Sequence, residues 1–337
     1  MGFTGTGLWA DVREVPGALT ATLDAAQGVA QAADLLRGEG VERVVAVGNG
    51  AAYYVAHALW LASLEGSAQD APPLVAVPCG VAVRERFQWR AGDAVLAISS
   101  SGEFRDVVEI ARGGHARWCV AITAGASSSL ARAATATVLQ HVESQRAVTH
   151  TQALCGAYAI GLALWAAVAG DDELASCVAG APEAAAQAIA VAEDWAPDAL
   201  AGRTAPIAAV AAGGGTAWAA ALELALMLKE IARVPAEGVE TREGATSAMF
   251  GLDRGHLMVS LDPAGDPLGD EALRLCAATG ADTLQLPSLG DVDQRLAPIS
   301  TLPACAALAA QLALAGGHDV DHPTWTDAYH ATARSAT

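Results

Sequence analysis

Short apolar runs bounded by turn residues alternate with segments of helical spacing along the first half of the chain. Most of these runs are about four to six residues long, which is typical of strands that are buried on both faces. The segments between the runs place apolar residues three and four apart, as amphipathic helices do. Strands are predicted at residues 43–47, 74–78, 94–98, 118–123 and 136–142, and helices at 18–37, 52–64 and 152–168. This alternation predicts a doubly wound parallel sheet.

The second half repeats the pattern of the first. An apolar run at 207–212 leads into Gly213-Gly214-Gly215-Thr216 and then a helix, which mirrors residues 45–54. We therefore predict an α/β protein with two tandem domains, each a doubly wound parallel five-stranded sheet flanked by helices. Further strands are expected at 256–261 and 283–286 and a closing helix at 302–315; the predicted parts are a leader 1–17, domains 18–175 and 176–318, and a C-terminal tail 319–337.

The most distinctive turn follows the third predicted strand. Ile98 is followed by Ser99-Ser100-Ser101-Gly102, and helical spacing starts at Phe104. The free N–H groups and the dipole of a helix start would face the serine hydroxyls, and together they would form an anion pocket that needs no lysine. The alternative is that the serines only cap the helix. The second half has Asp262 at the corresponding place, which would repel a phosphate, so the anion is expected in the first half only.

Composition narrows the classes of function. Of 337 residues, 53% are hydrophobic and 17% charged, which is enough apolar material for two cores. The net charge of −18 repels polyanions, so nucleic acid is not expected as a partner. The longest apolar stretch, near 157–170, is shorter than the roughly 20 residues of a membrane span, and no basic-then-apolar signal segment opens the chain. We therefore expect a cytoplasmic protein without a membrane partner.

Cysteine and lysine usage limits the possible cofactor chemistry. The six cysteines are scattered singly, without a CxxC pair or a histidine at zinc-finger spacing, so we expect buried free thiols and no metal site. No cofactor is predicted. Only Lys229 among the 19 basic residues is a lysine, so a Schiff base would have one candidate.

Two motifs carry a resemblance to a known family. Ile98-Ser-Ser-Ser-Gly-Glu resembles the phosphate-binding SQSGE turn of tandem sugar-isomerase (SIS) domain proteins. Leu222–Ile231 resembles the LEGALKLKEI helix of the isomerase half of glucosamine-6-phosphate synthase. The similarity extends in order over nearly the whole chain, from 14–18 through 83–86 to 317–323.

The resemblance implies roles for individual residues. Ser99, Ser100 and Ser101 would hold the phosphate of a sugar, together with the Gly48-Asn49-Gly50 turn and Thr151. Glu230 falls on the glutamate that moves a proton between C1 and C2, and Glu223 on the other active-site glutamate of the helix. A partly desolvated carboxylate suits this task near neutral pH. Because the two glutamates are seven residues apart, they share one helix face; the alternative is two solvated surface charges.

Several family residues are replaced. Gly50 and Phe104 are found where the family has hydroxyl donors, and Met227 is found where the family has a lysine in the helix. Thr246 stands for the histidine that opens the sugar ring, and no lysine follows Lys229. His150 is the first candidate to open the ring instead, and His322 and His330 are the next; Arg242 and Glu243 are expected to form an ion pair.

These replacements argue against a complete glutamine-dependent amidotransferase. The remaining residues suit an aldose–ketose isomerase, or a deaminase or deglycase of an amino or fructosamine phosphosugar, with Glu230 as base. The family implies a homodimer with shared active sites. The alternative is a phosphosugar-binding sensor without catalysis, and a different anion also stays open. The sequence does not identify the sugar.

Overall fold

The computed structural model describes residues 2–66, 71–84, 86–142 and 145–323, and it divides the chain into two compact units. The first-sheet unit comprises the described residues of Gly17–Glu143 and Gln152–Gly180. The second-sheet unit comprises those of Met1–Pro16, Ser144–Thr151 and Ala181–Thr324. Helix α1 (Gly7–Ala25) therefore contributes residues to both units.

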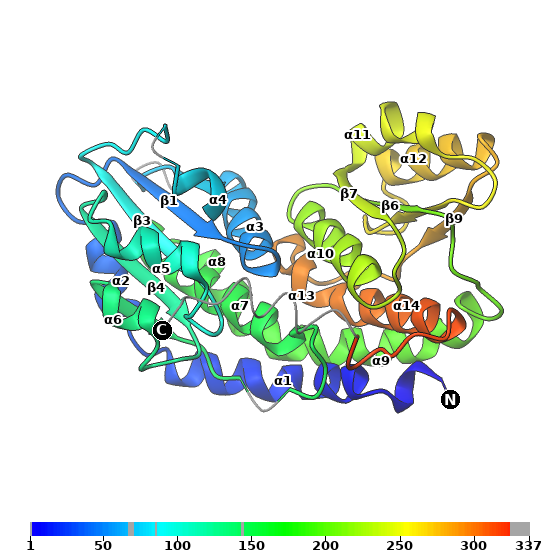
Figure 1. Cartoon of the computed structure of the whole chain (residues 1–337), viewed down its shortest axis with the longest axis horizontal. Helices are drawn as coiled ribbons and strands as arrows, with labels where there is room; N and C mark the ends of the chain where they lie inside the picture. Colours follow the sequence, from blue (N-terminus) through cyan, green and yellow to red (C-terminus); the bar gives the residue numbers. More distant parts are fainter. Residues whose placement is uncertain (1, 67–70, 85, 143–144, 324–337) are drawn as a thin grey trace. The chain divides into compact units, whose positions relative to one another are not determined.

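The first-sheet unit contains the five parallel strands predicted from the sequence (Figure 1). All six residues of β3 are buried, as expected for a strand that is covered on both faces. The strand order is β2-β1-β3-β4-β5, with bounds β1 (Arg43–Gly48), β2 (Leu74–Pro78), β3 (Asp93–Ile98), β4 (Trp118–Thr123) and β5 (Ala136–Leu139).

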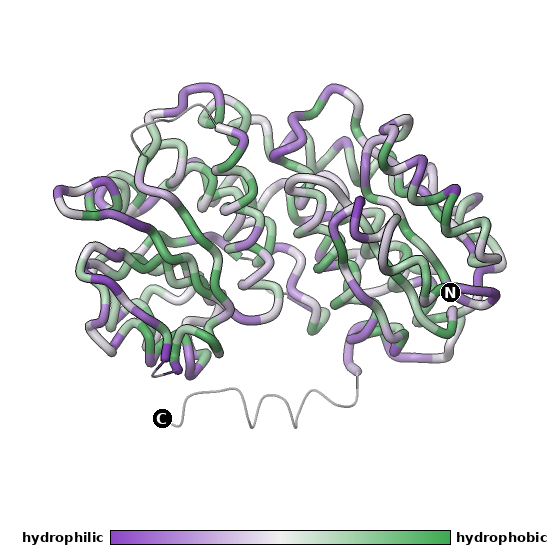
Figure 2. The backbone as a smooth tube through the Cα atoms, turned by 90° about the horizontal axis from the view of Figure 1, so that it is seen from above, coloured by the Kyte–Doolittle hydropathy of each residue, from purple (hydrophilic) through white to green (hydrophobic). Residues whose placement is uncertain are grey.

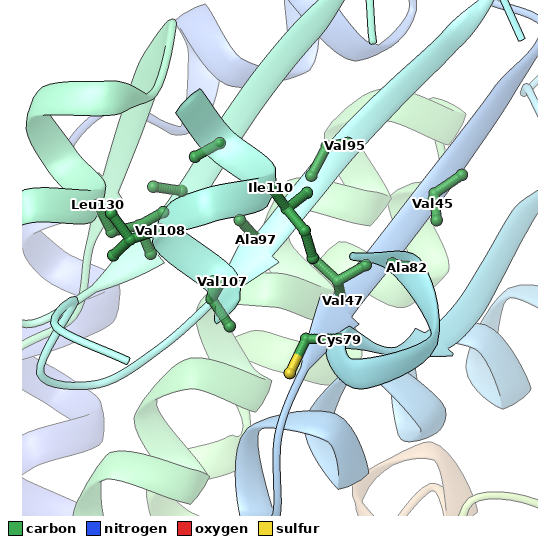
Figure 3. Close-up of a cluster of buried hydrophobic side chains, with 12 residues drawn as sticks. Val45, Val47, Cys79, Ala82, Val95, Ala97, Val107, Val108, Ile110 and Leu130 are labelled. Carbon is green, nitrogen blue, oxygen red and sulfur yellow. The ribbon is translucent and has the colours of Figure 1, made fainter. Parts of the chain in front are cut away.

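Helices cover both faces of this sheet because the crossovers run in two directions. On one side, α3 (Ala51–Glu65) packs on β1 and β2, and α2 (Val29–Leu36) packs on β4 and β5. Right-handed crossovers place the helices that lead toward β5 on the opposite face. These are α4 (Cys79–Ala82), α5 (Arg105–Arg112) and α6 (Ser129–Ala133). Figure 3 shows the core that α4, α5 and α6 form with the strands, where Val107 and Ile110 lie over Val47 and Ala97.

Two further helices complete this unit. Helix α7 (Thr151–Ala169) passes close to α3, since a Cβ atom on Gly161 would lie 2.8 Å from Leu59 Cδ1. Helix α8 (Asp172–Ala179) is preceded by its N-cap residue Asp171, whose carboxylate accepts the Leu174 N–H at 2.8 Å.

The second-sheet unit contains four parallel strands among its described residues, one fewer than predicted. Their order, β7-β6-β8-β9, repeats that of the first four strands of the other sheet. After β9 the chain passes through η3 (Gln294–Leu296) and α13 (Ala297–Ser300) into α14 (Leu302–Ala315), and no further strand forms there. The strands are β6 (Ala209–Gly213), β7 (Ala236–Glu240), β8 (Leu257–Ser260) and β9 (Asp282–Gln285).

Helices on the two faces of this sheet also follow the crossover rule. Helix α10 (Ala217–Glu230) packs on β6 and β7, and α14 packs on α10 and on α9 (Ala181–Ala199). Helices α11 (Thr241–Thr246) and α12 (Pro267–Ala278) enclose a second apolar core with the strands, and η2 (Ala248–Gly251) follows α11.

Three local predictions differ from the structure. Helix α1 begins at Gly7, inside the predicted leader 1–17. The pattern at 18–37 forms two helices instead of one, because the chain breaks at Ala26 and Gly28, both with positive φ. A Cβ on Gly28 would lie 2.1 Å from the Thr137 carbonyl oxygen, so only glycine fits there. Strand β7 was not predicted at all.

Among the described residues, two segments have the length and apolarity of a membrane span, Thr151–Ala169 and Gln294–Ala315. The bent helix pair Asp172–Ala179 and Ala181–Ala199 would be a third if it formed one span. The expectation that every apolar stretch is too short for a span is therefore wrong. In each of the two segments, 83% of the most apolar 18-residue window is buried inside the fold, so these apolar side chains pack in the protein interior. Figure 2 shows hydrophobic stretches, in green, running through the inside of each unit and hydrophilic residues, in purple, in many of the outer loops.

None of the six cysteines, all within the described residues, forms a disulfide, as predicted. Cys79, Cys155, Cys276 and Cys305 are buried, and the other two are half-buried.

Candidate functional site

The serine turn and the first glycine turn leave the same edge of the first sheet. Strands β1 and β3 are parallel neighbours, with Val47 opposite Ala97, so the turn Gly48–Gly50 and the turn Ser99–Ser101 both follow the carboxyl ends of adjacent strands. The chain leaves β1 toward β2 and leaves β3 toward β4, in opposite directions. Such a switch point is where open α/β sheets bind ligands.

Hydrogen bonds within the serine turn fix its shape. Ser99 Oγ accepts the Gly102 N–H at 3.2 Å, and Ser101 Oγ accepts the Glu103 N–H at 3.2 Å. A hydroxyl that accepts in this way still has its own proton to donate to a ligand. The Thr123 hydroxyl holds the turn from β4 by donating to the Ser100 carbonyl at 3.0 Å.

The serines do not cap the following helix. The N-cap residue of α5 is Phe104, which makes no side-chain capping bond. The N–H groups of Arg105, Asp106 and Val107 in the first turn have no acceptor within the described part of the chain. These donors and the positive end of the helix dipole favour an anion at this turn.

Gly102 allows the turn to lie against α6. Its φ is +66°, and a Cβ there would lie 2.1 Å from Ser128 Oγ. The next residue, Glu103, accepts the Ser129 N–H at 2.8 Å at the start of α6. The glycine and the glutamate of the motif therefore have structural roles.

The first glycine turn offers backbone groups in place of a hydroxyl. Gly48 is buried, and a Cβ there would lie 2.5 Å from the Ala52 carbonyl carbon, so α3 starts in close contact with the strand. Asn49 is exposed. Gly50 has φ +54° and ψ −132°, a backbone region that residues other than glycine rarely adopt. Phe104 packs against the apolar core.

The switch point of the second sheet is filled by the protein itself. Asp262, 5% exposed, follows β8 and accepts the Gly214 N–H at 2.6 Å through Oδ1. Its Oδ2 accepts the Thr241 hydroxyl at 2.6 Å. Burial raises the pKa of this carboxyl, and the Thr241 and Gly214 bonds lower it. The aspartate thus fills this switch point with a carboxylate of the protein itself.

The two predicted glutamates lie inside the second-sheet unit, on α10. Glu223 is 5% exposed, and burial, followed by the nearby Glu230 charge, raises its pKa to about 8. Glu230 is the last residue of α10 and is half-buried. Burial raises the pKa of Glu230 to about 7, against the opposing effects of the Thr149 hydroxyl and Lys229. These are not two solvated surface charges; Glu230 can both take and return a proton near neutral pH.

A loop before α7 reaches Glu230 within the same unit. Thr149 donates its hydroxyl to Glu230 Oε2 at 3.3 Å, a contact that the sequence analysis missed although it singled out the next two residues. His150 is exposed. Thr151 is 1% exposed, and its Oγ1 has no partner among the described residues. The structure thus brings Thr149, His150 and Thr151 into one unit with Glu223 and Glu230.

Other predicted residues have structural roles. Thr246 is exposed, and its hydroxyl donates back to the Arg242 carbonyl at 2.8 Å. Arg242 pairs with Glu271 of α12 at 3.0 Å, so the expected pair with Glu243 is wrong; Glu243 instead donates its N–H to Glu240. Met227 is fully buried. His322 is exposed, and His330 and the tail beyond residue 323 lie outside the described residues.

No family model and no curated protein matches the sequence. Solved structures do match the fold over nearly the full length. A protein described as a phosphosugar isomerase from Silicibacter pomeroyi is 25% identical, with a TM-score of 0.77 over 94% of this chain and 100% of that one.

Two other solved structures share the fold at lower identity. The C-terminal domain of glucosamine-fructose-6-phosphate aminotransferase from Francisella tularensis is 19% identical, with a TM-score of 0.74 over 96% of this chain and 100% of that one. Tagatose-6-phosphate ketose/aldose isomerase from Escherichia coli is 18% identical, with a TM-score of 0.73 over 95% of this chain and 98% of that one. The chain has the α/β fold of phosphosugar isomerases.

Proposed function

We propose that this protein is a phosphosugar-binding enzyme of the isomerase type, with the serine turn as phosphate site and Glu230 as proton-transferring base. Aldose–ketose isomerisation fits best. Release of an amine from an amino or fructosamine phosphosugar is the related alternative. A deaminase of glucosamine-6-phosphate from Thermotoga maritima also shares the fold, with a TM-score of 0.64 and 19% identity over 91% of this chain and 97% of that one.

The observation that carries the proposal is the raised pKa of the Glu230 carboxyl. A carboxylate with a pKa of about 7 is matched to neutral pH, at which it can remove a proton from C2 of an open-chain sugar and return it to C1. Between the two steps the carbonyl oxygen at C1 takes up a proton and the hydroxyl at C2 loses one, so the sugar is isomerised without net loss of atoms. Glu223, on the same helix, has a pKa of about 8 and would therefore be mostly protonated and uncharged at this pH.

The phosphate site is supported by two kinds of donor at the serine turn. Ser99, Ser100 and Ser101 supply hydroxyls, and the first turn of α5 supplies N–H groups without an acceptor in the described chain. His150 is the candidate for ring opening, and Thr151 for a contact to the sugar. We also propose a homodimer with active sites shared between subunits, in accordance with the family resemblance.

Turnover tests the proposal. The purified protein is incubated with fructose-, glucosamine- and fructosamine-6-phosphates, and products are identified by NMR.

Ser101→Ala should weaken the binding of a sugar phosphate far more than that of the free sugar; equal weakening would contradict the phosphate assignment. Thermal stabilisation by one of these ligands without any product would instead support the sensor, which the replacement of the family's histidine by Thr246 favours.

A further inference from the structure

The loop at 146–151, between β5 and α7, is anchored by a buried charge on α1. Asp11 is fully buried, and its Oδ2 accepts the N–H groups of Arg146 and Ala147 at 2.7 and 2.8 Å. Its Oδ1 accepts Arg146 Nη1 at 2.8 Å. A carboxylate is stable at such a depth only with partners of this kind, so the beginning of the loop is held in one place.

A second anchor comes from the far end of the described chain. The backbone oxygen of Asp321 accepts the Val148 N–H at 3.1 Å. The carboxylate of Asp321 accepts the N–H groups of Gly7 and Leu8, at 2.7 and 2.8 Å, at the start of α1. A negative charge is favourable at a helix start. Asp11 and Asp321 therefore tie the loop to the same helix.

These anchors place one hydroxyl against the proposed base. Thr149 is 4% exposed, its carbonyl accepts the Thr151 N–H at 3.1 Å, and its Oγ1 lies 3.3 Å from Glu230 Oε2. An ionised carboxylate has no proton to donate, so the hydroxyl must be the donor when Glu230 carries its charge. The contact therefore favours the ionised form of Glu230.

We propose that Thr149 is a positioning residue for Glu230, and that Asp11 and Asp321 hold the loop so that the Thr149 hydroxyl orients this carboxylate and keeps it ionisable. The proposal rests on the proposed role of Glu230 as base. Its effect on ionisation can nevertheless be measured without a substrate.

Lys229 lowers the pKa of Glu230 from the same helix, and the Glu230 charge raises the pKa of Glu223. From α14, the thiol of Cys305 lies near Glu223. None of these groups changes when Thr149 is replaced, so a shift in the titration of Glu230 would report the hydroxyl itself.

The test is a carboxyl-carbon NMR titration of the full-length protein labelled with [δ-13C]glutamate. The Glu230 signal is identified by its loss in Glu230→Gln, and that of Glu223 by its loss in Glu223→Gln. Thr149→Val should raise the pKa of Glu230 by about one unit, a tenfold change in its ionisation. Thr149→Ala should do the same without placing a methyl group beside the carboxylate, and Thr149→Ser should restore the wild-type titration.

Thr279→Val is the matched control. Its hydroxyl donates only to the Cys276 carbonyl, at 2.7 Å, at the end of α12. This variant should titrate like the wild type. An unchanged Glu230 midpoint in both Thr149→Val and Thr149→Ala would overturn the proposal, and so would an equal rise in Thr149→Ser.

The pH profile of turnover separates this proposal from the proposed function. If the enzyme isomerises a sugar phosphate, the acidic limb of kcat should move to higher pH in Thr149→Val by the shift seen in the titration. If the wild type turns over no sugar phosphate, the proposed function fails, and the titration alone still decides whether Thr149 controls the ionisation of Glu230.

Discussion

Replacing Glu223 by glutamine should stabilise the protein at neutral and alkaline pH. Glu223 is almost completely buried on α10, and its Oε2 has no hydrogen-bond partner among the described residues. The folded protein therefore keeps this carboxyl protonated, whereas the unfolded chain ionises it freely. Glutamine has nearly the same shape and no proton to lose, so it removes the pH dependence and leaves the packing in place.

The magnitude follows from the two pKa values of Glu223. Burial raises its pKa from 4.5 to about 8. Between these values the folded state binds one proton more than the unfolded state, so the free energy of unfolding falls as pH rises, by about 1.36 kcal/mol per pH unit. Relative to the variant, the wild type should lose roughly 3 kcal/mol by pH 7 and up to about 5 kcal/mol above pH 8. Below pH 4.5 this contribution is fully retained.

Urea unfolding of both proteins at pH 5, 7 and 9 measures this difference. The free energy of unfolding of the variant, relative to that of the wild type, should increase from pH 5 to pH 7 and again from pH 7 to pH 9. Glu109→Gln, which makes the same substitution at an exposed glutamate of α5, is the control. A difference between Glu223→Gln and wild type that stays constant from pH 5 to 9 would refute the conclusion that Glu223 is buried as a neutral acid.

Two further substitutions test the switch points of the sheets. Asp262→Ala leaves the Gly214 N–H and the Thr241 hydroxyl without their acceptor, so urea unfolding should show a loss of about 2 kcal/mol or more; a loss under about 0.5 kcal/mol would mean that the carboxylate contributes little there. Gly102→Ala forces a side chain into a position with φ +66° and toward Ser128, which should distort the serine turn. Calorimetry should then show sugar-phosphate binding weakened by at least about tenfold, or about 1.4 kcal/mol; wild-type affinity would exclude the serine turn as the phosphate site.

The sequence predicted the first sheet well because its strands are continuous apolar runs. All five strands of the first-sheet unit lie within a residue or two of their predicted starts, and α14 spans the predicted residues. Strand β7 was missed because it lies at the edge of its sheet and carries glutamates at Glu237 and Glu240, so no apolar run marks it. The break between α1 and α2 depends on the close approach of Gly28 to Thr137, far away in the sequence.

The candidate site was predictable in part. The serine turn and Glu230 carry local motifs, and the structure places each at the end of the predicted strand or helix. Thr149 carries no motif of its own: its contact with Glu230 depends on Asp11 and Asp321, which lie 138 and 172 residues away from it in the sequence. The filling of the second switch point by Asp262 likewise needed the positions of Gly214 and Thr241.

The central claim is that Glu230 moves a proton on a bound sugar phosphate, and hydrogen exchange at C1 and C2 tests it most directly. The protein is incubated with each sugar phosphate in deuterium oxide, and NMR follows deuterium at C2 of the aldose and at C1 of the ketose. The wild type should introduce deuterium, and Glu230→Gln should bind the same ligand without introducing it. Exchange at the wild-type rate in Glu230→Gln would contradict the account.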